Sequence, residues 1–294
     1  MFSRVLYQLS YLAANGRVPR GRRAQPRGRR RSRCPRNLWT TYVISRYRGA
    51  VTARVPLVAL LVAALAAAGG CGTGELTVYG ASSLKQVLPR VEEGPAYSFA
   101  GSDALARQIR DGAPADLFAA ASPRYPRELA RDGLCESPVP FATNTLAVIV
   151  PARGSPVRSF GDFERLEGAR LAIGEAAVPV GTYSREVLDR AGSKAVLERN
   201  TVSDEQDAAG VVSKVALGSA DAGLAYVTDA RAAAGRVRAV RIPASAQPTV
   251  VYEACVVRRS GARSNQAWAY LERLTGPEGQ AALKEAGFGP APAP

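Results

Sequence analysis

The stretch that decides the fold is Leu76–Leu88, with the sequence LTVYGASSLKQVL. An alternating run containing Leu76 and Val78 predicts a β-strand, and it ends in the small residues Gly80–Ser83. Apolar residues then recur at helical spacing, at Leu84, Val87, Leu88 and Val91. The first N–H groups of such a helix have no partners, so a strand, a tight turn and a helix in this order form a suitable anion site.

Ser83 has a second interpretation. Ser83 and Gln86 match a capping box, in which Ser83 only caps its own helix. Taken alone, the segment favours the cap, because caps are much commoner than binding sites.

Positive charge is concentrated at the N-terminus. The chain of 294 residues has a net charge of +14, but residues 1–70 hold 14 of the 39 Lys and Arg and no acid. Residues 71–294 therefore carry 25 basic and 25 acidic residues. The body therefore lacks the excess of positive charge that nucleic-acid binding requires, and no nucleic acid is expected as a partner.

Two segments precede the body. Residues 1–50 form a basic extension that is expected to be disordered. Residues 51–70 are typical of a signal peptide, and the small residues before Cys71 are typical of lipoprotein processing, so Cys71 is expected to carry lipid. Plain signal cleavage nearby is the alternative. Because a signal peptide normally begins a chain, we expect translation to start near Val51, with a genuine basic extension as the alternative.

Cysteine and histidine usage narrows the chemistry. Cys135 and Cys255 lie in the body, where an exported protein either pairs them or keeps two buried thiols; spacing alone leaves both open. Histidine is absent, which excludes His-ligated zinc and Ser-His-Asp catalysis. There is no phosphate-binding GxxxxGK[ST] loop, so the chain has no ATPase motif of its own.

Strand and helix signals alternate along the body, which predicts an α/β fold of mostly parallel sheets with helices on both faces. The residues Ser203–Asp207 are expected to open one of the helices. Ligands of such sheets bind where strands end and helices begin. Four of these junctions contain small or hydroxyl-bearing residues and no Lys or Arg: Ser82-Ser83, Gly101-Ser102, Val180-Gly181 and Asp207-Ala208. They suit an anion held by neutral donors, with Asp207 expected to cap its helix and face away.

Several co-linear motifs resemble the periplasmic molybdate-binding proteins of ABC importers: GSDALARQIRDGAPADLF, ATNTLAVIVP, LAIGEAAVPVGTYSREVL and AGLAYVTDA. The resemblance covers about residues 74–288. It implies the class II periplasmic-binding-protein fold, with two α/β lobes, two hinge crossings and an oxyanion in the cleft. We expect lobe 1 to comprise 71–143 plus 250–294 and lobe 2 to comprise 144–249.

The resemblance also implies the ligand set. The hydroxyls of Ser83 and Ser102, the main-chain N–H groups of Val180 and Ala208, and the phenol of Tyr226 fall on the family's oxyanion-binding positions. These residues would hold molybdenum as its oxyanion and not as a bare cation. Two features depart from the family: the distance from Ser83 to Ser102 is shorter than usual, and Gly101 stands where a second Ser is common. Both concern the edge of the pocket.

The function implied is that of a monomeric, lipid-anchored extracytoplasmic receptor that captures molybdate, and tungstate as well, for an ABC permease and its ATPase. It needs no cofactor. The nearest alternative is the same fold with another tetrahedral oxyanion such as sulfate. Ferric-ion binding is disfavoured because Tyr226 stands alone without His. An enzyme would need Ser83 or Ser102 as nucleophile with Lys85 as base, on a different helix face. A regulatory sensor would need a DNA-binding module, and the residues before Cys71 contain none.

Overall fold

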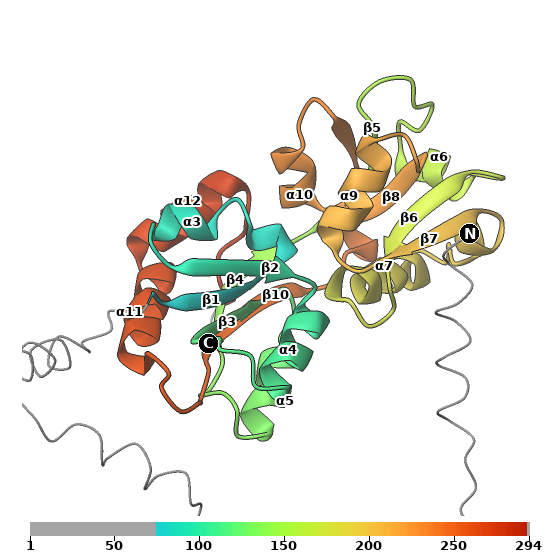
Figure 1. The fold of residues 1–294 in the computed structure, drawn as a ribbon. Helices are drawn as coiled ribbons and strands as arrows, with labels where there is room; N and C mark the ends of the chain where they lie inside the picture. Colours follow the sequence, from blue (N-terminus) through green and yellow to red (C-terminus); the bar gives the residue numbers. More distant parts are fainter. Residues whose placement is uncertain (1–74, 293–294) are drawn as a thin grey trace, which may run out of the picture. The chain divides into compact units, whose positions relative to one another are not determined.

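The computed structural model describes residues 75–292 (Figure 1). The predictions for the basic extension, the signal peptide and Cys71 lie outside these residues. Gly72–Pro294 form a single unit. In the described part of the chain, no helix combines the length and apolar character that a membrane span requires.

Lobe 1 is built on a sheet with the strand order β2-β1-β3-β10-β4. β1 pairs in parallel with β2 and β3, whereas β10 is antiparallel to β3 and β4. Side chains alternate across the sheet, so Val78 packs in one hydrophobic cluster and Tyr79 in the other. The elements of lobe 1 are β1 (Thr77–Ala81), η1 (Ser82–Leu84), α3 (Leu88–Val91), β2 (Ala96–Ala100), α4 (Ser102–Arg110), β3 (Leu117–Ala120), α5 (Arg124–Arg131), β4 (Val139–Asn144), β10 (Val250–Val256), α11 (Ser264–Thr275) and α12 (Pro277–Ala286).

Lobe 2 repeats this plan with the strand order β7-β6-β8-β5-β9. β6 pairs in parallel with β7 and β8, whereas β5 is antiparallel to β8 and β9. Each sheet is therefore mixed, with two parallel and two antiparallel pairings, where mostly parallel sheets were expected. Helices lie on both faces of the sheets (Figure 1), as the sequence predicts. The elements of lobe 2 are β5 (Leu146–Pro151), α6 (Phe160–Glu164), β6 (Arg170–Gly174), α7 (Pro179–Arg190), α8 (Ala195–Glu198), β7 (Thr201–Glu205), α9 (Ala208–Ala216), β8 (Ala222–Tyr226), α10 (Val227–Ala232), β9 (Val237–Arg241) and η2 (Ala244–Ala246).

Two chain crossings join the lobes. β4 leads into β5 through Thr145, and β9 returns to β10 through η2. The Gln247 side chain fastens the crossings together, because its Oε1 accepts from the Leu146 N–H at 3.1 Å and its Nε2 donates to the Leu146 carbonyl at 2.7 Å. The strands divide between the sheets at Asn144 and Val250, which supports the predicted lobe boundaries; the boundaries themselves stay a prediction.

The helix predicted from Ser83 to Val91 is broken in the structure. A 3₁₀ turn, η1, is followed by turn residues, and a new helix, α3, begins at Leu88. Pro89 explains the break: it has no N–H to bond to the Lys85 carbonyl, and its ring would clash with that carbonyl in a continuous helix. In the first turn of α3 the same proline is harmless.

The sequence analysis did not predict two of the strands, β7 and β4. The residues Ser203–Asp207 were expected to open a helix, but Thr201–Glu205 form β7 at the edge of the lobe 2 sheet. Most of its side chains are partly exposed, so they lack the apolar alternation of a strand. β4 contains Pro140, which weakens a strand signal; it is tolerated because β4 lies at the sheet edge.

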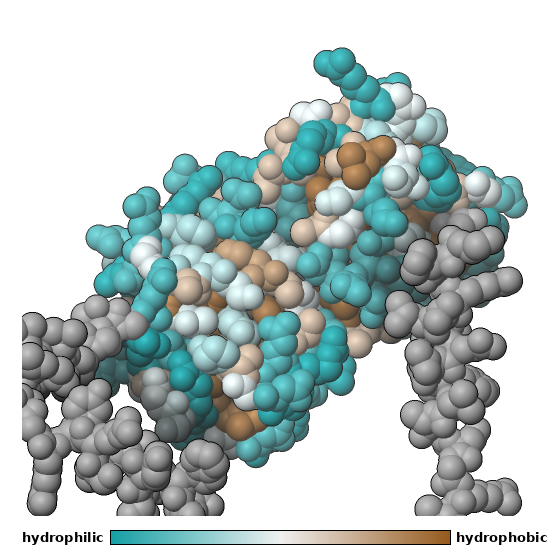
Figure 2. Space-filling view, in the orientation of Figure 1, coloured by the Kyte–Doolittle hydropathy of each residue, from teal (hydrophilic) through white to brown (hydrophobic). Residues whose placement is uncertain are grey.

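Apolar residues of the strands form the core. Residues such as Val78, Leu117, Ile173 and Leu224 are buried, and among the described residues the large exposed hydrophobic side chains are Leu217 and Trp268. Hydrophilic side chains cover most of the face drawn in Figure 2, around separate apolar patches. The two body cysteines form a disulfide: Cys135, between α5 and β4, is bonded to Cys255 in β10. Their Cα atoms are 5.8 Å apart.

Candidate functional site

A small pocket lies where the strands of both lobes end. It contains all five residues that the sequence analysis proposed for the ligand, and its free volume is about 10 Å³. None of the described residues that line it is Lys or Arg. The lining residues are Ala81, Ser82, Ser83, Ala100, Gly101, Ser102, Ala121, Val178, Pro179, Val180, Asp207, Ala208 and Tyr226.

Ser83 enters the pocket from η1 and is 8% exposed. No side chain caps η1, so the capping-box interpretation is wrong: Ser83 Oγ instead hydrogen-bonds the hydroxyl of Tyr252, at 3.0 Å. The partners are 169 residues apart in the chain. Ser83 therefore belongs to a tertiary hydrogen-bond network and not to its own helix end.

Ser102 begins α4, directly after β2 and Gly101, and is 1% exposed. Its Oγ accepts a hydrogen bond from the Ala121 N–H at 3.1 Å. A backbone N–H can only donate, so this bond uses a lone pair of Ser102 and leaves its O–H free to donate. The hydroxyl is therefore a fixed donor at the pocket wall.

Val180 and Ala208 offer main-chain donors from lobe 2. Val180 is the second residue of α7 and Ala208 the first of α9, so neither N–H has a partner within its helix. The Asp207 carboxylate accepts from the Gly210 N–H at 2.8 Å, which confirms its predicted role as a helix cap. The cap uses the Gly210 N–H and not that of Ala208, but the Asp207 carboxylate partly offsets the positive end of the α9 dipole, and Asp207 itself is among the residues that line the pocket.

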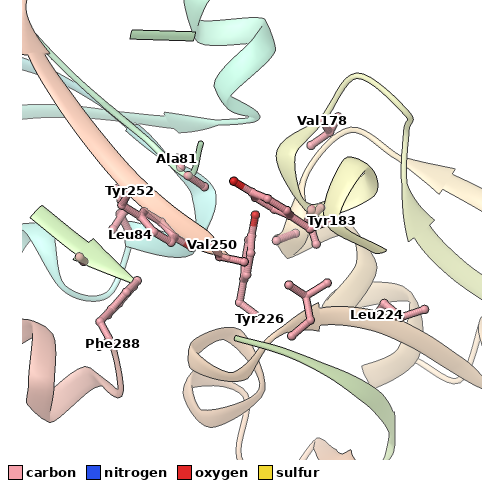
Figure 3. Packing of buried hydrophobic residues seen from close by; sticks show 14 of the residues in the cluster. Ala81, Leu84, Val178, Tyr183, Leu224, Tyr226, Val250, Tyr252 and Phe288 are labelled. Carbon is pink, nitrogen blue, oxygen red and sulfur yellow. The ribbon is translucent and has the colours of Figure 1, made fainter. Parts of the chain in front are cut away.

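Tyr226 ends β8 and is 1% exposed. Figure 3 shows its hydroxyl directed, with that of Tyr183, toward the space beside Ala81. Burial raises the pKa of Tyr226, so it stays a protonated donor. Among the described residues its hydroxyl has no hydrogen-bond partner. An unpaired buried O–H costs about 1–3 kcal/mol, which an acceptor in the pocket would recover.

The pocket is thus a set of neutral donors. Two serine hydroxyls, a phenol and two helix-start N–H groups converge from different elements, and the helix dipoles add partial positive charge. Such a set can hold an anion that has only acceptor oxygens. The described residues that line the pocket include one charged residue, Asp207, and no Lys.

The two lobes touch closely at the pocket edge. The Tyr125 hydroxyl of lobe 1 donates to the Ala177 carbonyl of lobe 2. Gly101 also faces the backbone of lobe 2: a Cβ at this position would lie 2.5 Å from the Gln206 carbonyl oxygen. Because contacts below 3.0 Å essentially never occur at a real Cβ, this approach of the lobes requires glycine.

Sequence reasoning missed Tyr252 and Asn144. Asn144 Nδ2 donates to Tyr252 OH at 3.3 Å and to Thr228 Oγ1 at 2.9 Å, so a buried network runs from Ser83 through the hinge to α10. Tyr252 lies in an alternating strand, and nothing local distinguishes it from a core aromatic. Its partners come from η1 and from the end of β4.

A larger cavity of about 360 Å³ shares Ser83 but is otherwise different. Arg90, Arg231 and Glu285 line it together with Phe288. Apart from Ser83, none of the five proposed ligand residues lines this larger cavity.

The family model described as "Bacterial extracellular solute-binding protein" matches residues 76–289. The chain belongs to this family. Among curated members, the molybdate-binding protein ModA of Mycobacterium bovis is 35% identical over 229 residues, which are 74% of this chain and 85% of that protein. Molybdate-binding protein ModA of Escherichia coli is 30% identical over 233 residues, 73% of this chain and 89% of that protein.

A solved member of this solute-binding class has the same fold. The periplasmic molybdate-binding protein of Azotobacter vinelandii superposes with a TM-score of 0.65 at 25% identity, over 73% of this chain and 98% of that chain. The two-lobed α/β architecture inferred from the sequence is therefore confirmed.

Proposed function

We propose that this solute-binding protein captures molybdate, and tungstate as well, and delivers it to the permease of an ABC importer. The observation that carries the proposal is the buried Tyr226 hydroxyl, which has no hydrogen-bond partner within residues 75–292 and shares one pocket with the Ser83 and Ser102 hydroxyls. Relatives at 35% and 30% identity are named molybdate-binding proteins, which supports the choice of oxyanion.

The geometry supports selection by hydrogen-bond type. A buried dianion is stable only if its oxygens are paired with donors, and five donors line the pocket beside the Asp207 carboxylate, which accepts from the Gly210 N–H as the cap of α9. Hydrogen phosphate carries an O–H that needs an acceptor, and among the described side chains that line the pocket the carboxylate acceptor is Asp207. Sulfate is also a tetrahedral dianion, and its discrimination would depend on the size of the closed pocket. The pocket is tight, so an oxyanion enters when the lobes move apart and is then enclosed.

Thermal unfolding tests this function. Melting of the purified protein should be recorded with molybdate, tungstate, sulfate and phosphate at the same concentration. A ligand at 100 times its Kd stabilises the native state by about 2.7 kcal/mol, which corresponds to a rise in Tm of roughly 5–10 °C for a domain of this size. No rise with molybdate or tungstate refutes the proposal, and a rise confined to sulfate supports the alternative ligand.

We further propose that the mature protein is a monomer held at the outer face of the cell membrane by lipid on Cys71. The small residues before Cys71 support this site. Replacing Cys71 with Ser should release the protein from the membrane fraction. Retention of the variant there would exclude Cys71 as the anchor, and light scattering of the released protein would test the monomer.

A further inference from the structure

We propose that Asn144 and Tyr252 fix the direction of the hydrogen bond at Ser83, so that the Ser83 O–H is reserved for the bound oxyanion. This inference rests on the proposed function and names two positioning residues that do not line the pocket. The chain of bonds runs from the Thr145 N–H to Ser83 and is directional at each step.

The first step fixes the Asn144 amide. Asn144 Oδ1 accepts from the Thr145 N–H at 2.9 Å, and a backbone N–H can only donate. The other amide atom is therefore the NH₂ group, which donates to Thr228 Oγ1 and to Tyr252 OH. The orientation of Asn144 follows from the backbone and is not free to reverse.

The second step fixes the Tyr252 hydroxyl. Tyr252 is fully buried, and its ring packs edge-on against Phe141, Tyr226 and Phe288, with centroids 5.3–6.0 Å away. Among the described residues its hydroxyl has two hydrogen-bond partners, Asn144 Nδ2 and Ser83 Oγ. Since Nδ2 cannot accept, Ser83 Oγ is the acceptor that remains for the Tyr252 proton. Burial also raises the pKa of Tyr252, so this proton is retained.

The last step concerns Ser83 itself. Because Tyr252 donates to Ser83 Oγ, the Ser83 proton is not used by Tyr252 and can point at an acceptor in the pocket. If the order were reversed, Ser83 would donate to Tyr252 and the buried Tyr252 O–H would lack an acceptor. Ser102 Oγ likewise accepts a bond, from the Ala121 N–H, which leaves the Ser102 proton for an acceptor in the pocket. Both serines therefore present donors to an anion.

The direction of the chain predicts selectivity. A molybdate oxygen accepts from Ser83, whereas the O–H of hydrogen phosphate at this position would need Ser83 Oγ to accept a second bond. Asn144→Asp reverses the chain with almost no change of shape. Its second carboxylate oxygen accepts the Tyr252 proton, and Ser83 then donates to Tyr252.

The experiment is a double-mutant cycle of Asn144→Asp and Tyr252→Phe, with affinities for molybdate and for inorganic phosphate measured by calorimetry. Asn144→Asp should weaken molybdate binding roughly 10- to 100-fold, the loss of a donor to a charged acceptor, and weaken phosphate much less. In the Tyr252→Phe background the same change should have a small effect, because the hydroxyl that transmits the reversal is gone.

If Asn144→Asp acted only through its new negative charge, it would weaken the binding of molybdate and of phosphate alike. The effect would also be the same with Tyr252 and with Phe at this position. That result overturns the proposal, as does unchanged molybdate affinity in Asn144→Asp. If Asn144→Asp does not fold, the cycle of Tyr252→Phe with Ser83→Ala replaces it. Tyr252→Phe should then weaken binding a few-fold only while Ser83 is present; an equal loss in both backgrounds means that Tyr252 acts on the fold. Wild-type protein that binds none of the four oxyanions refutes the proposed function as well.

Discussion

Replacing Gly101 with Ala should weaken oxyanion binding without harming the fold. The new Cβ would lie 2.5 Å from the Gln206 carbonyl oxygen of lobe 2. Gly101 has φ −60° and ψ 138°, a backbone conformation that any residue adopts, so alanine causes no local strain. The clash therefore exists only when the lobes are closed.

The magnitude follows from this contact. Relief to an ordinary distance of 3.4 Å requires the two backbones to separate by about 0.9 Å. Overpacking of this kind costs about 1–3 kcal/mol, which is roughly a 5- to 150-fold rise in Kd. The Asp103 side chain lies 2.7 Å from the same Cβ but can rotate away, whereas the Gln206 backbone cannot.

Calorimetry of molybdate binding and melting without ligand together test the reasoning. The Kd should rise, while the ligand-free Tm stays the same or increases slightly, since alanine restricts the unfolded chain. Gly161→Ala is the matched control: its Cβ would lie 3.4 Å from the end of the Arg165 side chain and 3.8 Å from the Ser159 hydroxyl, which are ordinary contacts within lobe 2, so affinity should not change. An unchanged Kd in Gly101→Ala, or a lower ligand-free Tm, would refute a role for Gly101 in closure.

Three further predictions concern other parts of the protein. Ser102→Ala should weaken binding by about 1–3 kcal/mol, because it removes a donor and leaves the Ala121 N–H without its acceptor; calorimetry that finds wild-type affinity would show that Ser102 does not contact the ligand. Burial raises the pKa of Asp229 from 3.8 to about 7, so the folded state holds this proton more tightly and stability falls as the pH rises from about 4 to about 7. Asp229→Asn should remove that fall, and its advantage in urea unfolding should grow over this window by at most about 4 kcal/mol; a constant difference across pH would contradict the assignment. Reducing the Cys135–Cys255 disulfide, which spans 120 residues, should lower the free energy of unfolding by about 2–5 kcal/mol, and equal urea midpoints with and without reductant would contradict it.

Much of the fold could be predicted from local patterns. Strands such as Ala96–Ala100 and Ala222–Tyr226 are short apolar runs that read the same in the sequence and in the structure. The helix starts at Ser102 and Ala208 follow from a small or capping residue before an apolar repeat. One error occurs where Pro89 interrupts an otherwise helical pattern of apolar residues. The other occurs where the edge strand β7 lacks a buried face and therefore lacks apolar alternation.

Part of the candidate site could also be predicted from the sequence, and part needed the structure. Strand-to-helix order predicts that the junctions at Ser83, Ser102, Val180 and Ala208 lie where ligands bind, because the carboxyl ends of parallel strands meet at one edge of each sheet. Tyr226 was implied only by the family resemblance. The structure brings these five residues into one pocket. Their contact with the ligand stays a proposal.

The sequence by itself determined the α/β class, helix starts such as that at Ser102 and the charge of the body, since these depend on neighbours in the chain. Only the tertiary structure decided what the Ser83 hydroxyl does. Read locally it was a helix cap; in the fold its partner is Tyr252, 169 residues away. Hydrogen-bond direction inside a protein depends on every donor and acceptor within reach, and Asn144 and Tyr252 come within reach of Ser83 only when the two hinge crossings close the fold around them.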